Sequence, residues 1–121
     1  MATTSIDEAE RMRRFPGIEF VDGPTGRRAH FPGTMDLREV VQAFRLCNGN
    51  REFMLRNFEL TPEQIETALA YYAAYPDEID AYFDQQRRGA EFLDKYAPLV
   101  PDGSGAWRSL KTGETGLNFP D

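Results

Sequence analysis

Apolar residues recur at intervals of three and four along three stretches in the middle of the chain, the spacing of an amphipathic helix. The first stretch is "MDLREVVQAFRLCNGN", residues 35–50. Asp36 can cap this helix at its start, with Glu39 reaching back as in a capping box. Asn48 and Gly49 tolerate the left-handed backbone that commonly ends a helix. The predicted apolar stripe is Leu37, Val40, Val41 and Phe44.

The second stretch, "REFMLRNF", predicts a helix of about two turns that begins after Asn50. Its side chains expected to be buried are Phe53, Met54 and Phe58. The third stretch, "TPEQIETALAYY", has the strongest start signal in the chain. Thr61 is a favourable N-cap, Pro62 takes the position where a missing N–H costs nothing, and Gln64 completes a capping box. Its predicted buried stripe is Ile65, Ala68, Leu69 and Tyr72.

Pro76 interrupts the helical pattern, so either the helix kinks there or a new helix begins with Pro76 in its first turn. The rhythm then continues to about Ala97. The apolar positions of this segment are Ile79, Phe83, Ala90 and Leu93. A long helix of this kind buries its stripe against another surface, and a second copy of the chain is the simplest candidate.

Two short β-prone runs surround the turn formers "DGPTG" in "IEFVDGPTGRRAHF", which predicts a hairpin. Alternation places one set of side chains on the same face of it, namely Ile18, Phe20, Ala29 and Phe31. Before the hairpin, "SIDEAERMRR" predicts a short helix that Ser5 and Glu8 can cap. Pro16 and Gly17 are expected to end it.

The last stretch, residues 98–121, contains three prolines and four glycines, so no regular element is expected and an extended chain is predicted. Apolar side chains are nevertheless spaced through it, and its candidate partner-binding residues are Trp107, Leu110, Leu117 and Phe119. Two interpretations remain open. The segment either folds over its own domain, or it wraps around a partner and orders on binding.

The chain has 121 residues and a net charge of −6, which indicates one globular domain with a tail and argues weakly against a simple nucleic-acid binder. Residues 1–58 carry nine arginines against eight acids, whereas residues 59–96 carry nine acids against three bases. A single cysteine suits a reducing compartment. The polar N-terminus and the lack of an apolar run near ~18 residues predict a cytoplasmic protein without a signal peptide or membrane span.

No catalytic constellation is recognisable in the sequence. His30 and Cys47 are the only histidine and cysteine, which does not match the spacing of common metal sites. No glycine-rich loop joins a predicted strand to a helix, so no phosphate-binding loop is expected. The sequence therefore predicts a protein that is not an enzyme, with no catalytic residue, metal or cofactor.

The short helix, the link "EL" and the longer helix have the lengths of a helix–turn–helix unit. The hairpin ending in "FPGT", the first helix and "REFMLRNFELTPEQIETALAYYAAYPDEIDAYF" are similar to the bacterial family called domain of unknown function 433, over about residues 15–88. Its most specific part is "LTPEQIETALAYY…PDEID". The resemblance implies a mainly α fold: a small, homeodomain-like helix–turn–helix domain with an N-terminal β-hairpin and a long C-terminal helix.

Four segments follow from this interpretation. They are an N-terminal arm with a short helix (1–14), the hairpin with the helix–turn–helix core (15–75), a helical extension (76–97) and the extended Pro/Gly-rich tail (98–121). Many members of the family resemble VapB-type antitoxins of toxin–antitoxin systems. The resemblance thus implies a homodimer that binds its operator DNA, regulates its own transcription and blocks a PIN-like ribonuclease toxin with its C-terminal part.

The basic residues indicate where such DNA contacts could lie. Candidate phosphate contacts are Arg11, Arg13, Arg14, Arg27 and Arg28. Gln64 and Thr67 are candidate base-reading residues. The simpler interpretations are a solvated helix face for "RMRR" and plain helix capping for Gln64. Two other functions also fit the sequence: a stand-alone helix–turn–helix regulator, and a protein-interaction adaptor that does not bind DNA.

Overall fold

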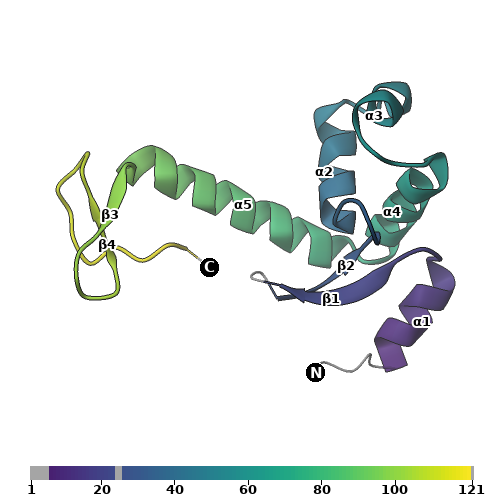
Figure 1. The fold of residues 1–121 in the computed structure, drawn as a ribbon, viewed down its shortest axis with the longest axis horizontal. Helices are drawn as coiled ribbons and strands as arrows, with labels where there is room; N and C mark the ends of the chain where they lie inside the picture. Colours follow the sequence, from purple (N-terminus) through teal and green to yellow (C-terminus); the bar gives the residue numbers. More distant parts are fainter. Residues whose placement is uncertain (1–5, 24–25, 121) are drawn as a thin grey trace. The chain divides into compact units, whose positions relative to one another are not determined.

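The computed structural model describes residues 6–23 and 26–120, and within these ranges it contains five α-helices and two short antiparallel hairpins (Figure 1). The chain divides into two compact units, Met1–Ile79 (unit 1) and Asp80–Asp121 (unit 2). The prediction of a mainly helical chain with an N-terminal hairpin is confirmed at this level. In the part of the chain that is described, no helix is long and apolar enough to cross a membrane.

Unit 1 begins with α1 (Ile6–Arg14), followed by β1 (Glu19–Gly23) and β2 (Gly26–His30). The two strands pair antiparallel with Phe20 opposite Ala29, which confirms the predicted hairpin. Of the four side chains expected on one face, Ile18, Ala29 and Phe31 are buried and Phe20 is half-buried. Ser5 and the turn residues 24–25 lie outside the described residues.

Helix α2 (Leu37–Leu46) buries its predicted stripe with the exception of the half-buried Phe44, and it packs against α4. Asn48 and Gly49 have positive φ angles of 51° and 76°, as expected after a helix end. The predicted side-chain cap at Asp36 is wrong, because its carboxylate caps no backbone N–H. Ion pairs with two arginines hold that carboxylate instead.

Helix α3 (Arg51–Asn57) has the expected cap, since the Asn50 side chain accepts a hydrogen bond from the backbone N–H of Phe53 at 3.0 Å. Met54 is fully buried, and Phe58 is half-buried. The predicted burial of Phe53 is wrong, because its side chain is 44% exposed. A helix of seven residues has only a narrow face in contact with the core. Met54 lies on this face, and the neighbouring Phe53 does not.

Helix α4 (Pro62–Ala74) starts as predicted, with Pro62 in its first turn and both hydrogen bonds of the Thr61–Gln64 capping box. Its buried stripe differs by one position from the prediction. The buried residues are Ile65, Ala68 and Tyr71, while Leu69 and Tyr72 are half-buried. Tyr71 can be fully buried because its hydroxyl finds charged partners inside the unit.

Helix α5 (Pro76–Tyr96) is a new helix, because Tyr75 between α4 and α5 has φ −131° and ψ 58°. Ile79 in unit 1 is buried as expected. In unit 2 the predicted stripe is wrong at two positions, since Ala90 and Leu93 are exposed. The inward face instead contains Gly89 and the half-buried Phe92.

Unit 2 continues with β3 (Leu99–Pro101) and β4 (Trp107–Ser109), which pair antiparallel. Trp107 also exchanges two backbone hydrogen bonds with Leu117, at 2.9 and 3.0 Å. The expectation of an extended tail without regular structure is therefore corrected. The turn formers close a compact loop, in which the Asp102 carboxylate accepts bonds from the N–H groups of Ser104 and Gly116 at 2.8 and 2.9 Å.

Candidate functional site

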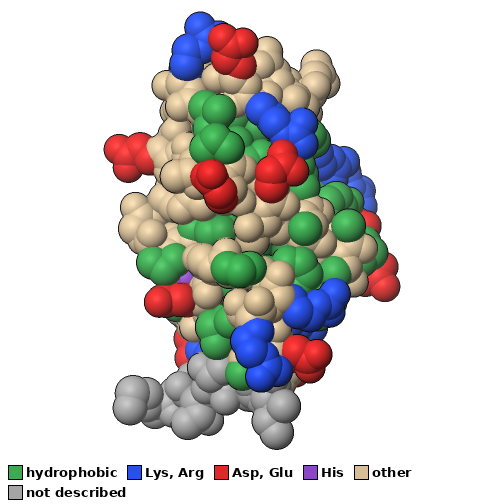
Figure 2. Space-filling model, turned by 90° about the vertical axis from the view of Figure 1, so that its right-hand side faces the viewer, with side chains coloured by type: hydrophobic (Ala, Val, Ile, Leu, Met, Phe, Trp, Pro, Cys, Tyr) green, Lys and Arg blue, Asp and Glu red, His purple; other side chains and the backbone are tan. Residues whose placement is uncertain are grey.

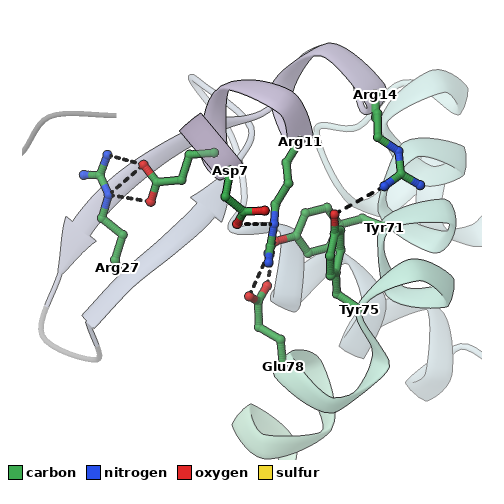
Figure 3. Close-up of polar contacts among 8 residues, drawn as sticks. Asp7, Arg11, Arg14, Arg27, Tyr71, Tyr75 and Glu78 are labelled. Atoms are coloured by element: carbon green, nitrogen blue, oxygen red, sulfur yellow. Dashed lines mark hydrogen bonds and ion pairs between the residues drawn. The ribbon is translucent and has the colours of Figure 1, made fainter. Parts of the chain in front are cut away.

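Arg11 is the centre of a polar cluster that joins α1 to α4 and α5 inside unit 1 (Figure 3). Its Nη1 donates to the Tyr71 hydroxyl at 2.7 Å and to Glu78 Oε1 at 2.9 Å. The Tyr71 hydroxyl in turn donates to Glu78 Oε2 at 2.6 Å. Arg11 Nε lies 2.9 Å from Asp7 on its own helix. We call Arg11, Tyr71 and Glu78 the Arg11 cluster.

Aromatic rings surround the Arg11 cluster and set its electrostatics. The Arg11 guanidinium lies 3.7 Å from the centre of the Tyr75 ring, and Phe15 meets the Tyr71 ring edge-on at 5.3 Å. Burial and the bond to Glu78 raise the pKa of the Tyr71 hydroxyl above its ordinary value, so it stays protonated and donates. Burial opposes the charge of Arg11, but its bonds to Glu78 and Tyr71 outweigh this and raise its pKa.

Two further candidate phosphate contacts are also held by carboxylates. Arg27 on β2 makes a two-pronged contact with Glu8 of α1, both shorter bonds being 3.0 Å, and lies 3.5 Å from Asp22. Arg28 Nε lies 2.6 Å from Asp36, which Arg38 also contacts at 3.1 Å. Three of the five predicted phosphate-binding arginines are therefore engaged within unit 1.

The other two arginines are more accessible. Arg13 is exposed, and no ion pair involves it among the described residues. Arg14 is exposed as well, and its contacts are a long bond of 3.4 Å to the Tyr75 hydroxyl and a position 5.2 Å from the centre of the Phe15 ring. Both side chains can reach an external anion without breaking an ion pair.

The predicted base readers lie at the start of α4. The Gln64 side-chain oxygen accepts the Thr61 N–H at 2.9 Å, so the capping role is real, and Thr67 is half-exposed. The exposed charges of α4 are Glu63 and Glu66, and the helix contains no basic residue. Figure 2, seen from the right of Figure 1, shows hydrophobic side chains between charges of both signs. The surface of α4 itself therefore offers no positive field for DNA.

The candidate partner-binding residues all belong to unit 2, whereas the candidate DNA-binding arginines belong to unit 1. Trp107, Leu110 and Phe119 are 39%, 57% and 49% exposed, and Leu117 is half-buried. Phe119 returns to α5, where its ring meets Phe92 edge-on at 5.2 Å. The structure thus places these residues on a folded unit and not on an extended tail.

Four exposed apolar side chains were not predicted as binding residues. Leu46, Phe53 and Leu55 in unit 1 are 77%, 44% and 39% exposed, and Leu93 in unit 2 is 44% exposed. Leu46 borders a groove of about 260 Å³ that also includes Met35, Cys47 and Phe58. The spacing of apolar residues in α2 could have predicted that Leu46 is exposed. Leu46 does not lie on the buried face of the helix, whose predicted apolar stripe ends at Phe44.

A small cavity in unit 1 lies beside the Arg11 cluster. It measures about 40 Å³ and includes Arg28, Arg38, Tyr71 and Glu78 in its wall. That volume suits a few water molecules and is far below the ~300 Å³ of an ordinary ligand pocket. Within residues 6–23 and 26–120, no group of His, Cys, Asp and Glu could hold a metal ion.

Comparisons of the chain with protein-family models, curated protein sequences and solved structures found no significant match.

Proposed function

We propose that this chain is a cytoplasmic antitoxin that acts by binding another protein, a PIN-like ribonuclease toxin, through unit 2. One observation carries the proposal: large apolar side chains of a folded unit remain in contact with solvent. They are Leu93, Trp107, Leu110 and Phe119, between 39% and 57% exposed. Exposed apolar groups of this size, a tryptophan above all, are typical of protein interfaces.

The acidic character of the chain supports the same class of partner. An enzyme that cuts RNA needs a positively charged surface for its substrate, and residues 59–96 carry nine acids against three bases. Opposite charges would speed the encounter, and the apolar side chains would supply the lasting contact. The proposal also includes a homodimer, for which the apolar groove beside Leu46 is the available surface.

Trp107→Ala is expected to weaken binding to the product of the adjacent gene about tenfold or more, because an interface tryptophan is a common energetic centre. The variant keeps the backbone bonds to Leu117 that hold this part of unit 2. Leu55→Ala is the matched control, since Leu55 in unit 1 has the same exposure of 39%. Calorimetric titration measures both affinities, and sedimentation of the same samples distinguishes a dimer from a 13.8 kDa monomer.

Equal losses in the two variants would remove Trp107 from the interface. If the purified chain bound no neighbouring gene product at all, the antitoxin proposal would fail and a regulator or an adaptor would remain.

Operator DNA binding by unit 1 is the second candidate function. It is supported by the succession of the seven-residue α3 and the thirteen-residue α4, joined by residues 58–61, because these lengths suit a helix–turn–helix unit. The exposed Arg13 and Arg14 are the accessible phosphate contacts. Because α4 has no basic residue, the affinity for DNA would come from the arginines of α1 and the hairpin. Gln64 and Thr67 would lie near the edges of the DNA bases.

The double substitution Arg13→Ala with Arg14→Ala is expected to weaken binding to operator and unrelated duplexes alike, because phosphate contacts are independent of sequence. The slope of log affinity against log salt concentration should fall by up to about 2, since each contacted phosphate contributes about 0.9. Fluorescence anisotropy at several salt concentrations measures both quantities. Absence of DNA binding even at low salt would exclude operator binding and leave toxin binding through unit 2 or an adaptor function.

A further inference from the structure

The contact between Glu8 and Arg27 is bidentate, and an arginine binds a phosphate group with the same geometry. Glu8 accepts two bonds of 3.0 Å from Arg27, one from Nε and one from Nη2. The pair is largely shielded from water, because the side chains are 15% and 26% exposed. A planar guanidinium uses the same two donors for a carboxylate or for a phosphate, so the two ligands exclude each other.

We propose that α1 is an acidic strap whose Glu8 competes with nucleic-acid phosphate for Arg27, so that unit 1 binds a duplex weakly until Glu8 is displaced. This rests on the DNA-binding function proposed for unit 1. In the strapped state, Arg13 and Arg14 are the two of the five candidate arginines that no ion pair occupies among the described residues. Displacement adds Arg27 to the phosphate-binding set.

Glu8 is the competitor that matters at Arg27. The other nearby carboxylate, Asp22, lies 3.5 Å away and its side chain is 64% exposed, so solvent screens it. The ion pair of Arg28 is of another kind. Asp36 precedes α2, is 11% exposed and is shared with Arg38, which makes that pair part of the fixed core. Of the ion pairs of Arg27 and Arg28, the pair with Glu8 is the one that opens when a peripheral helix moves.

Helix α1 is built so that it can be displaced. Its nine residues are fewer than the ~12–15 that an isolated helix needs for stability in water, so its contacts with the rest of unit 1 hold it in place. Besides the buried Phe15 that follows it, the contacts that hold α1 are mostly polar, and they include the bonds of Glu8 to Arg27 and of Arg11 to Tyr71 and Glu78. Arg14 adds only a long bond of 3.4 Å to the Tyr75 hydroxyl (Figure 3). A polyanion attracts the arginines of α1 and repels Glu8, and both effects favour the exchange.

Two changes at Glu8 test the strap. Glu8→Gln removes its charge, while Glu8→Asp keeps the charge and shortens the side chain that reaches Arg27. Glu10→Gln is the matched control, because Glu10 is an exposed residue of the same helix without an ion pair among the described residues. The probe is a fluorescein-labelled DNA duplex of random sequence, titrated at low salt and followed by anisotropy.

Glu8→Gln is expected to raise duplex affinity about fivefold and Glu8→Asp about threefold, against less than about twofold for Glu10→Gln. Trypsin should also cleave α1 faster in the two Glu8 variants than in the control. Binding by Glu8→Gln when the unaltered chain does not bind would support the strap as well.

Equal affinities of all variants would overturn the strap and leave DNA binding intact. If no variant, Glu8→Gln included, bound the duplex, the DNA-binding function and the strap would fail together. Circular dichroism of each variant confirms that unit 1 is folded before it is titrated.

Discussion

Tyr71→Ala is expected to lower the free energy of unfolding of unit 1 by about 4 kcal/mol, within the range for a buried aromatic side chain. Tyr71 is fully buried, and its ring touches those of Phe15 and Tyr75 at 5.3 and 4.9 Å between centres. The substitution also removes the hydroxyl that links Arg11 to Glu78. Hydrogen exchange of peptides from unit 1 measures the loss without interference from unit 2.

Tyr71→Phe separates the hydroxyl from the ring and is expected to account for about 2 kcal/mol of that loss, because its bonds involve charged groups. Tyr75→Phe is the matched control. Among the described residues its hydroxyl makes only the 3.4 Å contact with the exposed Arg14, so almost no change is expected. Equal stabilities of the two phenylalanine variants would show that the Arg11 cluster contributes little to folding.

The raised pKa of Tyr71 gives the same cluster a pH dependence. The folded-state pKa lies above the ordinary value of 10.0, so on raising the pH the unfolded chain releases this proton first. The hydroxyl's contribution is therefore complete below about pH 10 and is lost as the pH rises towards the folded-state pKa. Tyr71→Phe should lack this alkaline loss.

Features determined by neighbouring residues were predictable from the sequence. The Thr61–Gln64 capping box and the end of α2 at Asn48 and Gly49 depend on three or four consecutive residues, and both are present. The Asp36 cap is equally local, yet it failed. Its carboxylate lies beside Arg28, which comes from β2, and a charged partner binds it more strongly than a backbone N–H.

Two kinds of feature were not predictable in the same way: which face of a helix is buried, and which residues far apart in the sequence make contact. Tyr71 and Tyr72 differ by about 100° around α4, and the partners that bury Tyr71 come from α1 and α5. Glycine and proline content after Ala97 predicted an extended chain, whereas the segment contains the β3–β4 hairpin. Such content cannot show that Trp107 pairs with Leu117 or that Ser109 reaches the end of α5, since those contacts depend on the folded unit.

The candidate site shows the same limit. Sequence identified the arginines and the apolar residues of the C-terminal segment by residue type alone. The carboxylate that occupies each arginine depends on tertiary structure, and this pairing separates Arg13 and Arg14 from Arg11, Arg27 and Arg28. Charge counting therefore overestimated the number of arginines open to DNA.

Ser109→Ala is expected to lower the free energy of unfolding of unit 2 by about 2 kcal/mol, because it removes a buried hydroxyl that makes three hydrogen bonds to the backbone. Ser109 is fully buried, and its hydroxyl donates to the carbonyl of Tyr96 at the end of α5. The same oxygen accepts the N–H groups of Lys111 and Thr112 at 3.1 and 3.0 Å. Removal of this one hydroxyl therefore breaks three hydrogen bonds, one to the end of α5 and two within the turn that follows β4.

Trp107 is the only tryptophan of the chain, so its fluorescence during urea unfolding reports on unit 2 alone. Ser104→Ala is the matched control. In the described part of the chain that exposed hydroxyl bonds only to Asp102, which keeps its bonds to two backbone N–H groups. The Trp107 transition should move to lower urea in Ser109→Ala and stay almost unchanged in Ser104→Ala. Coincident transitions would mean that the C-terminal segment is held by its apolar contacts with α5, and that the Ser109 hydroxyl is dispensable.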